Sequence, residues 1–248
     1  MNRFFVDKEQ ILDDRIKILG NDVKHIKDVL RLGMGDKVEI VCDGKIYTCK
    51  ILDLKSNMIN TIILDNYKGK NEPPIHIALY QSIAKGNKMD FIIQKATEIG
   101  VEKIYPVITE RTIVKIKNPK KEEGKVERWN SIAEEAAKQS KRDILPVVKN
   151  IISFNEMVDI LKNETNIIVP YEMEDSYGLK EALNNVGTGE INIIIGPEGG
   201  FEEEEINKLR SIKGQVVTLG PRILRTETAG LVVSSIVLYE LGDLGVIR

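Results

Sequence analysis

The chain has 248 residues and a net charge of −2, with 42% hydrophobic, 30% charged and 5% aromatic residues. This composition is typical of a globular protein long enough for one large domain or two smaller ones. Its apolar runs are far shorter than the roughly 20 residues that span a bilayer, and its first residues lack a signal-peptide pattern, so we expect a cytoplasmic protein. Two cysteines and two histidines provide neither a disulfide framework nor a metal-ligand spacing, and no metal site is expected.

Charge is distributed unevenly along the chain. Residues 1–148 contain 27 basic and 22 acidic side chains, whereas residues 149–248 contain 9 basic and 16 acidic ones. A basic first part joined to an acidic last part is compatible with a polyanion-binding surface in the first part. Chance scatter of solvated charges would give the same count.

Short strands dominate the first seventy residues, several of them with alternating apolar and polar side chains. The expected strands are 3–6, 16–19, 37–42, 45–52 and 58–64. Asp43-Gly44 is a strong signal for a type I′ hairpin, and residues 22–30 have the pattern of a short amphipathic helix. These elements predict a small β-barrel. A polar stretch with two prolines, residues 67–74, is the best linker candidate, so we expect domains at 1–72 and 73–248.

After this linker, strands and helices alternate. The expected strands are 75–83, 103–109, 166–170, 191–195 and 215–219, and the expected helices are 87–99, 125–140, one capped by Ser153 and Glu156, 179–184, 202–210 and 226–241. Such alternation predicts an α/β domain with a mainly parallel sheet covered by helices on both faces.

The first candidate ligand loop is Gly196-Pro-Glu-Gly-Gly-Phe201, between an apolar strand and a helix. Its glycines would allow a ligand to approach the backbone closely and would leave amide groups accessible. The spacing matches neither the G-x-G-x-x-G dinucleotide fingerprint nor a P-loop. The loop therefore predicts a ligand site of another kind.

The second candidate loop is Leu219-Gly-Pro-Arg-Ile-Leu-Arg-Thr-Glu-Thr-Ala-Gly230, again between a strand and a helix. Arg222, Arg225 and Glu227 add more polar chemistry than a simple connection needs. A structural alternative is that Thr226 or its neighbour caps the last helix while both arginines are solvated. Because both loops follow strands of one parallel sheet, we expect them to meet at the same edge, where ligands collect.

With these two loops, the sequence resembles the bacterial 16S rRNA uracil-N3 methyltransferase family, which belongs to the knotted SPOUT class. The similarity also includes residues 3–5, 25–31, 81–100, 110–111 and 128–142, and so covers nearly the whole chain. The resemblance implies an N-terminal PUA-like β-barrel that binds RNA and a C-terminal α/β methyltransferase domain with a deep trefoil knot. It also implies S-adenosylmethionine as the methyl donor, a homodimer, and 16S rRNA within an assembled small ribosomal subunit as the partner.

In this family three loops hold the cofactor, and here they would follow Val169, Ile195 and Leu219. By motif position the resemblance assigns the pocket to Pro170, Gly196, Glu198, Gly199, Leu219, Gly220, Ile223, Leu224, Arg225 and Thr226. S-adenosylhomocysteine would be the product.

Methylation of uracil N3 requires the nitrogen to lose its proton and to be aligned with the methyl group. We expect Arg222 and Arg225 to stabilise the negative charge that develops on the uracil oxygens. Glu198 and Glu227 are candidate proton acceptors, and an alternative role for Glu198 is to bind backbone amides of its own turn.

The target base must be unpaired or extruded, because N3 lies on its Watson–Crick edge. Candidate phosphate contacts are Arg3, Lys24, Arg31, Lys85, Lys88, Lys95, Arg111, Arg128 and Arg142, although each could also be a solvated charge. The lysine-rich residues 115–125 are interpreted as an exposed loop, and Trp129 as a core residue.

Two other functions remain open: a related SPOUT methyltransferase for tRNA or ribose 2′-OH, and a non-catalytic RNA-binding module.

Overall fold

The computed structural model describes residues 1–113 and 119–246, and its contacts divide the chain into two units. The first unit comprises residues 1–72 and 137–145, and the second comprises residues 73–136 and those from 146 onward. The main segment of the first unit ends at Glu72, where the sequence also predicts a boundary. Residues 137–145 lie with the first unit, although the sequence places them in the second domain. The predicted domain limits therefore stay a prediction.

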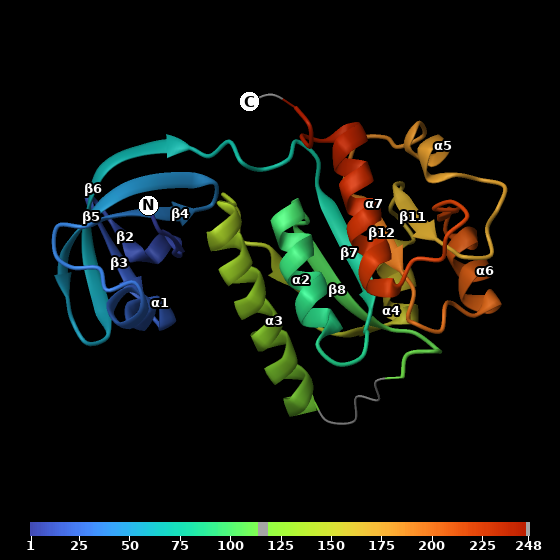
Figure 1. The fold of residues 1–248 in the computed structure, drawn as a ribbon, viewed down its shortest axis with the longest axis horizontal. Coiled ribbons are helices and arrows are strands. Elements are labelled where there is room, and N and C mark those ends of the chain that lie inside the picture. The colour runs from blue at the N-terminus through green and yellow to red at the C-terminus, as the bar shows by residue number, and fades with distance from the viewer. Residues whose placement is uncertain (114–118, 247–248) are drawn as a thin grey trace. The chain divides into compact units, whose positions relative to one another are not determined.

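A curled six-stranded sheet with the order β1-β4-β5-β6-β3-β2 forms most of the first unit (Figure 1). The strands are β1 (Arg3–Phe5), β2 (Ile11–Leu12), β3 (Arg15–Leu19), β4 (Lys37–Cys42), β5 (Lys45–Leu54) and β6 (Met58–Lys68). β1 is parallel to β4, and the other pairings of this sheet are antiparallel. Asp43 and Gly44 have φ values of 46° and 74°, which fits the predicted type I′ turn between β4 and β5.

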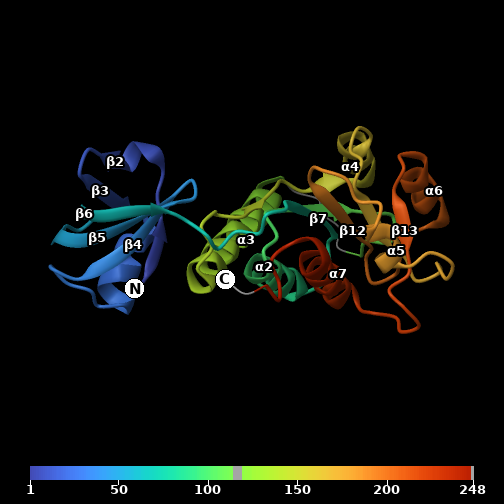
Figure 2. The same cartoon turned by 90° about the horizontal axis from the view of Figure 1, so that it is seen from above.

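The sheet is curved, as the blue strands in Figure 2 show, and its buried side chains form an apolar cluster. Phe4, Ile16 and Ile59 of this cluster are at most 1% exposed. The expected amphipathic helix is present as α1 (Asn21–Lys24), which continues into a π-helical turn at His25–Val29. Apolar side chains of both segments are buried in the cluster, so this sheet has a hydrophobic core of its own.

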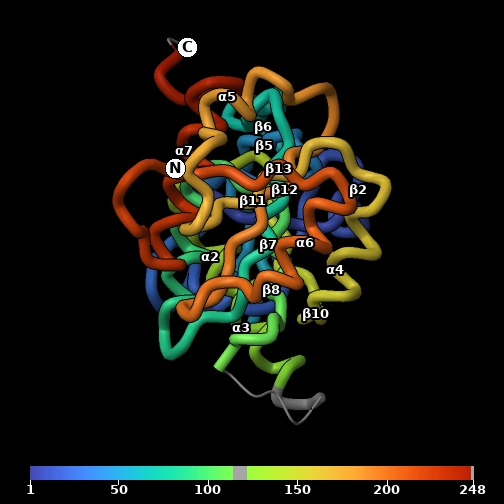
Figure 3. Tube along the Cα trace, turned by 90° about the vertical axis from the view of Figure 1, so that its right-hand side faces the viewer, coloured from blue at the N-terminus to red at the C-terminus, as the bar shows by residue number. Residues whose placement is uncertain are grey.

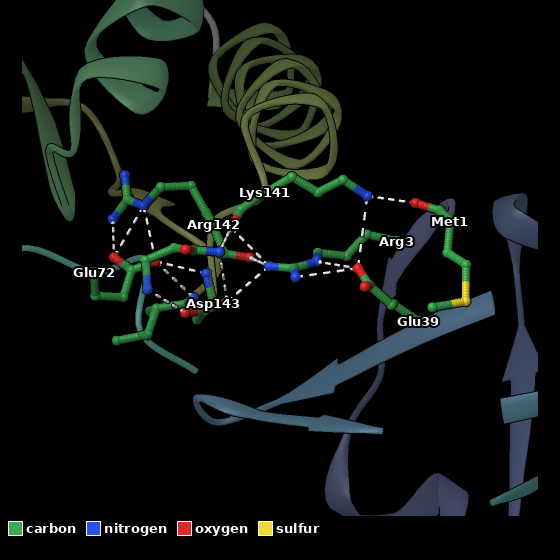
Figure 4. A network of polar contacts seen from close by, with 9 residues as sticks. Met1, Arg3, Glu39, Glu72, Lys141, Arg142 and Asp143 are labelled. Atoms are coloured by element: carbon green, nitrogen blue, oxygen red, sulfur yellow. Dashed lines mark hydrogen bonds and ion pairs between the residues drawn. The ribbon is translucent and has the colours of Figure 1, made fainter. Parts of the chain in front are cut away.

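A buried polar network joins residues 137–145 to the rest of the first unit (Figure 4). Nη1 of Arg3 donates to Oδ1 of Asp143 at 2.7 Å, and Nε of Arg3 donates to Oε2 of Glu39 at 3.1 Å. Arg142 pairs with Glu72 at 2.6 Å. Arg3, Arg142 and Asp143 are only 5%, 3% and 1% exposed. Because an unpaired buried charge is costly, these pairs fix the segment within the unit.

The second unit contains a seven-stranded sheet with the order β10-β8-β7-β12-β11-β13, and β9 pairs with β8. The strands are β7 (Ile77–Ser82), β8 (Lys103–Ile108), β9 (Val147–Val148), β10 (Ile152–Ser153), β11 (Ile167–Pro170), β12 (Ile191–Ile195) and β13 (Gln215–Val217). Their pairings are parallel. This confirms the predicted parallel sheet. It also makes β12, β11 and β13 neighbours, so the loops that follow them leave the same edge.

Helices cover both faces of this sheet (Figure 3). They are α2 (Lys88–Ile99), α3 (Pro119–Ser140), α4 (Phe154–Leu161), α5 (Leu179–Leu183), α6 (Glu203–Ser211) and α7 (Thr226–Leu241). Side chains of α2, α3, α5 and α7 form one apolar layer, and side chains of α4 and α6 form the other. Along β7, Leu79 faces the first layer and Tyr80 faces the second, as the side-chain alternation of a strand requires.

Two local expectations differ from the structure. Residues 115–118 of the lysine-rich stretch lie outside the described residues, but the chain is helical from Pro119, so α3 begins earlier than expected and the rest of the stretch is no loop. The helix expected at 87–99 is α2, which begins at Lys88, so Asn87 is its N-cap and not its first helical residue. Trp129 is in the core, as predicted, with 5% exposure. Over residues 1–113 and 119–246, no helix is both long and apolar enough to cross a membrane.

Candidate active site

A cavity of about 900 Å³ opens at the carboxyl ends of β11, β12 and β13 in the second unit. The segments that follow these strands line it, together with Lys88 at the start of α2. Every residue that the resemblance assigns to the cofactor lines this cavity: Pro170, Gly196, Glu198, Gly199, Leu219, Gly220, Ile223, Leu224, Arg225 and Thr226. The cavity thus brings these residues together, and their contacts with a cofactor stay a prediction.

The first glycine loop depends on the absence of side chains. Gly200 has a φ of 71°, a left-handed conformation that favours glycine. A Cβ at Gly196 would lie 3.1 Å from the ring of Phe201, which is buried against α4. The loop is also held from outside, because Nη1 of Arg111 donates to the carbonyl oxygen of Gly199 at 2.8 Å. These contacts fix a loop whose backbone lines the cavity.

The second glycine loop is joined to the first by a hydrogen bond. Gly220 has a φ of 101°, which allows the chain to turn after β13. Arg225 is the N-cap of α7, and Thr226 is the first helical residue, with 6% exposure. Oγ1 of Thr226 donates to the carbonyl oxygen of Gly196 at 2.6 Å. The threonine therefore links both loops, a role that the sequence did not predict.

Lys88 connects the two candidate carboxylates. Its Nζ lies 3.2 Å from Oε1 of Glu198 and 3.2 Å from Oε2 of Glu227. Burial alone would raise the pKa of Glu198, but hydrogen bonds from the backbone amides of Lys85 and Glu198 and the contact with Lys88 outweigh it, so this pKa is lowered. The same two carboxylates raise the pKa of Lys88. Glu198 is thus a stabilised carboxylate and a weak base. Glu227, the other candidate proton acceptor, is not among the residues that line the cavity.

Arg222 and Arg225 are exposed and line the cavity. Their guanidinium groups have no hydrogen bond or ion pair with another side chain in residues 1–113 and 119–246. Ile223, between them, is 85% exposed. Because neither guanidinium group has a partner in the described chain, both are available for a ligand with negative charge.

The loop after β11 gives the cavity an acidic side. Tyr171, Glu172, Glu174 and Asp175 line it. Hydrogen bonds from the hydroxyl and the backbone amide of Ser176 lower the pKa of Glu174. In this loop, sequence motifs assigned no site residue beyond Pro170. Only the position of the loop after a strand that lies beside β12 could have indicated that its acidic residues line the cavity.

The candidate phosphate-binding residues fall into different environments. Arg3 and Arg142 are buried in the ion pairs of the first unit, so we withdraw them from the candidate RNA surface. Arg111 pairs with Glu202 at 2.6 Å, which raises the pKa of Arg111 and lowers that of Glu202. Lys88 faces the carboxylates of the cavity.

The remaining candidates lie on the surface of their own units. Lys95 pairs with Glu98 at 2.8 Å, and Arg128 pairs with Asp90 at 2.5 Å. The remaining three side chains are exposed and have no hydrogen-bond or ion-pair partner within the described part of the chain: Lys24, Arg31 and Lys85. These three are the best placed to contact a phosphate, and RNA binding by any of the set stays a prediction.

Comparisons with known proteins find matches to both parts of the chain. A family model described as RNA methyltransferase domain matches residues 71–238, and one described as RNA methyltransferase PUA domain matches residues 18–63. The chain is 34% identical to ribosomal RNA small subunit methyltransferase E of Bacillus subtilis (strain 168), over 97% of both chains. It is 35% identical to the protein of that name from Aquifex aeolicus (strain VF5), over 88% of this chain and 91% of that one.

A solved structure shows the same fold. The crystal structure of a ribosomal RNA small subunit methyltransferase E from Neisseria gonorrhoeae, bound to S-adenosyl methionine, has a TM-score of 0.86 and 32% identity, and covers 98% of this chain and 99% of that one. The predicted fold class, a PUA-like barrel followed by a SPOUT methyltransferase domain with a mainly parallel sheet, is confirmed. The chain belongs to the family of ribosomal RNA small subunit methyltransferase E.

Proposed function

We propose that this protein transfers the methyl group of S-adenosylmethionine to N3 of a specific uridine in the 16S rRNA of the small ribosomal subunit. Membership of the family supports methylation of ribosomal RNA. One observation carries the more specific proposal: Arg222 and Arg225, without partners in the described chain, line the same cavity as both glycine loops. This arrangement combines a site for a cofactor with positive charge for an anionic base.

The cavity fits S-adenosylmethionine. Its volume of about 900 Å³ lies within the range of small-molecule sites. Glycines at 196, 199, 200 and 220 leave backbone groups accessible, and the acidic loop after β11 suits a ligand with a sulfonium and an ammonium group. We assign the cofactor to the residues named above by motif position. When bound, S-adenosylmethionine supplies an electrophilic methyl group.

Arg222 and Arg225 would bind the uracil as it becomes anionic. Loss of the N3 proton places negative charge on the two flanking carbonyl oxygens, and guanidinium groups stabilise such charge strongly where water is partly excluded. The same groups lower the pKa of N3–H and thus increase the reactive fraction at neutral pH. Positioning and charge stabilisation therefore account for most of the proposed rate enhancement.

The proton acceptor follows from the environment of the two carboxylates. Glu198 has a lowered pKa, and Glu227 faces Lys88 instead of the cavity, so neither carboxylate is arranged as a strong base. We propose that the N3 proton leaves to water, and that Glu198 fixes its loop through Lys85 and Lys88. In this account, the rate of methylation depends on deprotonated uracil in the wild-type protein, and it still does so in variants that lack either carboxylate.

We further propose a homodimer that acts on the assembled small subunit. On α7, Ile236 and Tyr239 are 36% and 67% exposed, which is high for apolar and aromatic side chains of a helix beside a core. These two residues are candidates for the contact with a second copy. Sedimentation of the wild-type chain and of the Tyr239→Glu variant tests this: a dimer that the substitution does not weaken would contradict the assignment.

The function is tested with small subunits from cells that lack this protein. Subunits, free 16S rRNA and tRNA are incubated with methyl-labelled cofactor, and the labelled nucleotide is mapped. We expect label in 16S rRNA at one uridine, more from subunits than from free RNA. Label in tRNA alone, or on ribose, would favour the related SPOUT reaction. Cofactor binding that fails altogether would favour a non-catalytic RNA-binding module.

A further inference from the structure

We propose that Gln81 is a positioning residue that sets the separation of the two glycine loops and thereby the affinity for the cofactor. The proposal rests on the proposed function, because it concerns the same cavity. Gln81 lies on β7, the central strand beside β12, and its side chain is fully buried. It does not line the cavity, and it acts through Thr226 and Gly196, which do.

A directed chain of hydrogen bonds runs from β7 to the first glycine loop. Nε2 of Gln81 donates to Oγ1 of Thr226 at 2.9 Å, and Oγ1 of Thr226 donates to the carbonyl oxygen of Gly196 at 2.6 Å. A carbonyl oxygen can only accept, so the single hydroxyl proton of Thr226 is committed to Gly196. The oxygen of Thr226 must then accept from an N–H group, which the amide of Gln81 provides.

The orientation of this amide is fixed by its other contacts. Nε2 also donates to the carbonyl oxygen of Ser82 at 3.1 Å. A rotated amide would place Oε1 against the oxygen of Ser82, where two acceptors repel each other, and would leave the Thr226 oxygen without a donor. Oε1 of Gln81 has no hydrogen-bond partner in the described residues. A Cβ at position 230 would lie 3.2 Å from this oxygen, so glycine there lets α7 approach the amide.

This series of hydrogen bonds sets the geometry of the cavity. The loop after β12 contributes Gly196, the loop after β13 leads into Thr226, and the rigid central strand β7 holds both through one side chain. Without the amide, the buried hydroxyl of Thr226 lacks its donor and is free to turn away from Gly196. The two loops then lose their fixed separation, and cofactor affinity falls because the site must be ordered on binding.

The test uses the full chain with Gln81→Met, which keeps the side-chain volume but removes the amide. Isothermal titration with S-adenosylmethionine measures the dissociation constant, and steady-state methylation of small subunits separates KM from kcat. We expect the dissociation constant and the KM for the cofactor to rise about ten-fold, as loss of a buried hydrogen bond would give. At saturating cofactor, kcat should change less than about two-fold. A merely structural role would lower the melting temperature without raising the KM for the cofactor more than it changes kcat.

Ser82→Ala is the matched control, because the hydroxyl of Ser82 is equally buried on β7 and has no partner in the described chain. It should leave the dissociation constant unchanged. If Gln81→Met does not fold, Gln81→Glu decides: the carboxylate donates to Thr226 only when protonated, so cofactor affinity should recover as pH falls. Wild-type affinity at neutral pH in the variant that folds would overturn the inference. Failure of the wild-type protein to bind the cofactor would instead overturn the proposed function.

Discussion

Nζ of Lys88 lies 3.2 Å from Oε1 of Glu198, although the two residues are 110 positions apart in the chain. The contact ties the first glycine loop to the start of α2, and a second contact of the same lysine reaches Glu227. Lys88 is therefore part of the wall of the cavity, where it neutralises carboxylates and holds a loop. This explains why a positive charge at position 88 should matter before any RNA is bound.

Replacing Lys88 with methionine should make stability less dependent on pH at both ends of the range. The pKa of Glu198 is lowered from 4.5, so its stabilising contribution is complete above that value and is lost as pH falls toward the lowered pKa. The pKa of Lys88 is raised from 10.5, so its contribution is complete below that value and is lost as pH rises above it. Thermal unfolding of both proteins from pH 3 to 11 checks this. The melting temperature of the wild type should exceed that of the variant by a constant amount between pH values of about 4.5 and 10.5. An advantage that grows in acid would contradict it.

Replacing Arg222 or Arg225 with alanine should lower kcat for methyl transfer by about 10² to 10³-fold, the usual cost of removing a donor to a developing negative charge. Both side chains are exposed and make no ion pair in the described chain, so the melting temperature should stay unchanged. Single-turnover rates at saturating cofactor provide the measurement. Lys162→Ala, at the residue that follows α4, is a control, since this exposed lysine pairs only with Asp159 within the described chain. Rates within two-fold of wild type for both arginine variants would exclude their proposed role.

Replacing Arg3 with methionine should destabilise the first unit by about 3 to 5 kcal/mol, because it leaves the carboxylate of Asp143 buried without its cation. Urea unfolding followed by a probe in residues 1–72 measures the change. Arg15→Met is the control, because Arg15 and its partner Asp14 are exposed and lie 3.8 Å apart. Equal stability of both variants would show that the buried pair does not hold residues 137–145 in place.

Replacing Lys24 with glutamine should weaken RNA binding without changing sequence preference. If Lys24 neutralises one phosphate, the slope of log affinity against log salt should fall by about 0.7 to 0.9. Binding of 16S rRNA fragments at several salt concentrations tests this, with Lys162→Gln as the control of equal charge change. Identical slopes for both variants would remove Lys24 from the RNA surface.

The sequence predicted those parts of the site that depend on local pattern. An apolar strand, three glycines and a helix signal follow one another at residues 191–203, and a strand, the single Gly220 and a helix signal follow in the same order at residues 215–226. Parallel pairing then requires both loops to leave one edge, so the meeting of Gly196 and Thr226 at one cavity followed from chain order and topology.

Features set by distant contacts could not be predicted in this way. Arg3 donates to Asp143 across 140 positions, and only the folded first unit shows that this arginine is buried. Lys88 likewise reads as a surface cation until β7 is known to lie beside β12. Charge patterns in a sequence indicate which side chains could bind a phosphate. Only the tertiary structure shows which of them already form an ion pair with a carboxylate of the same protein.

The most direct test of the account is the identity of the methylated nucleoside. Small subunits from cells lacking this protein are methylated in vitro, the 16S rRNA is digested to nucleosides, and the product is identified by chromatography and mass spectrometry. We predict one 3-methyluridine for each subunit, absent when Arg222 and Arg225 are both replaced with alanine. A methyl group on ribose, on another base position, or on no ribosomal RNA at all would contradict the proposed reaction.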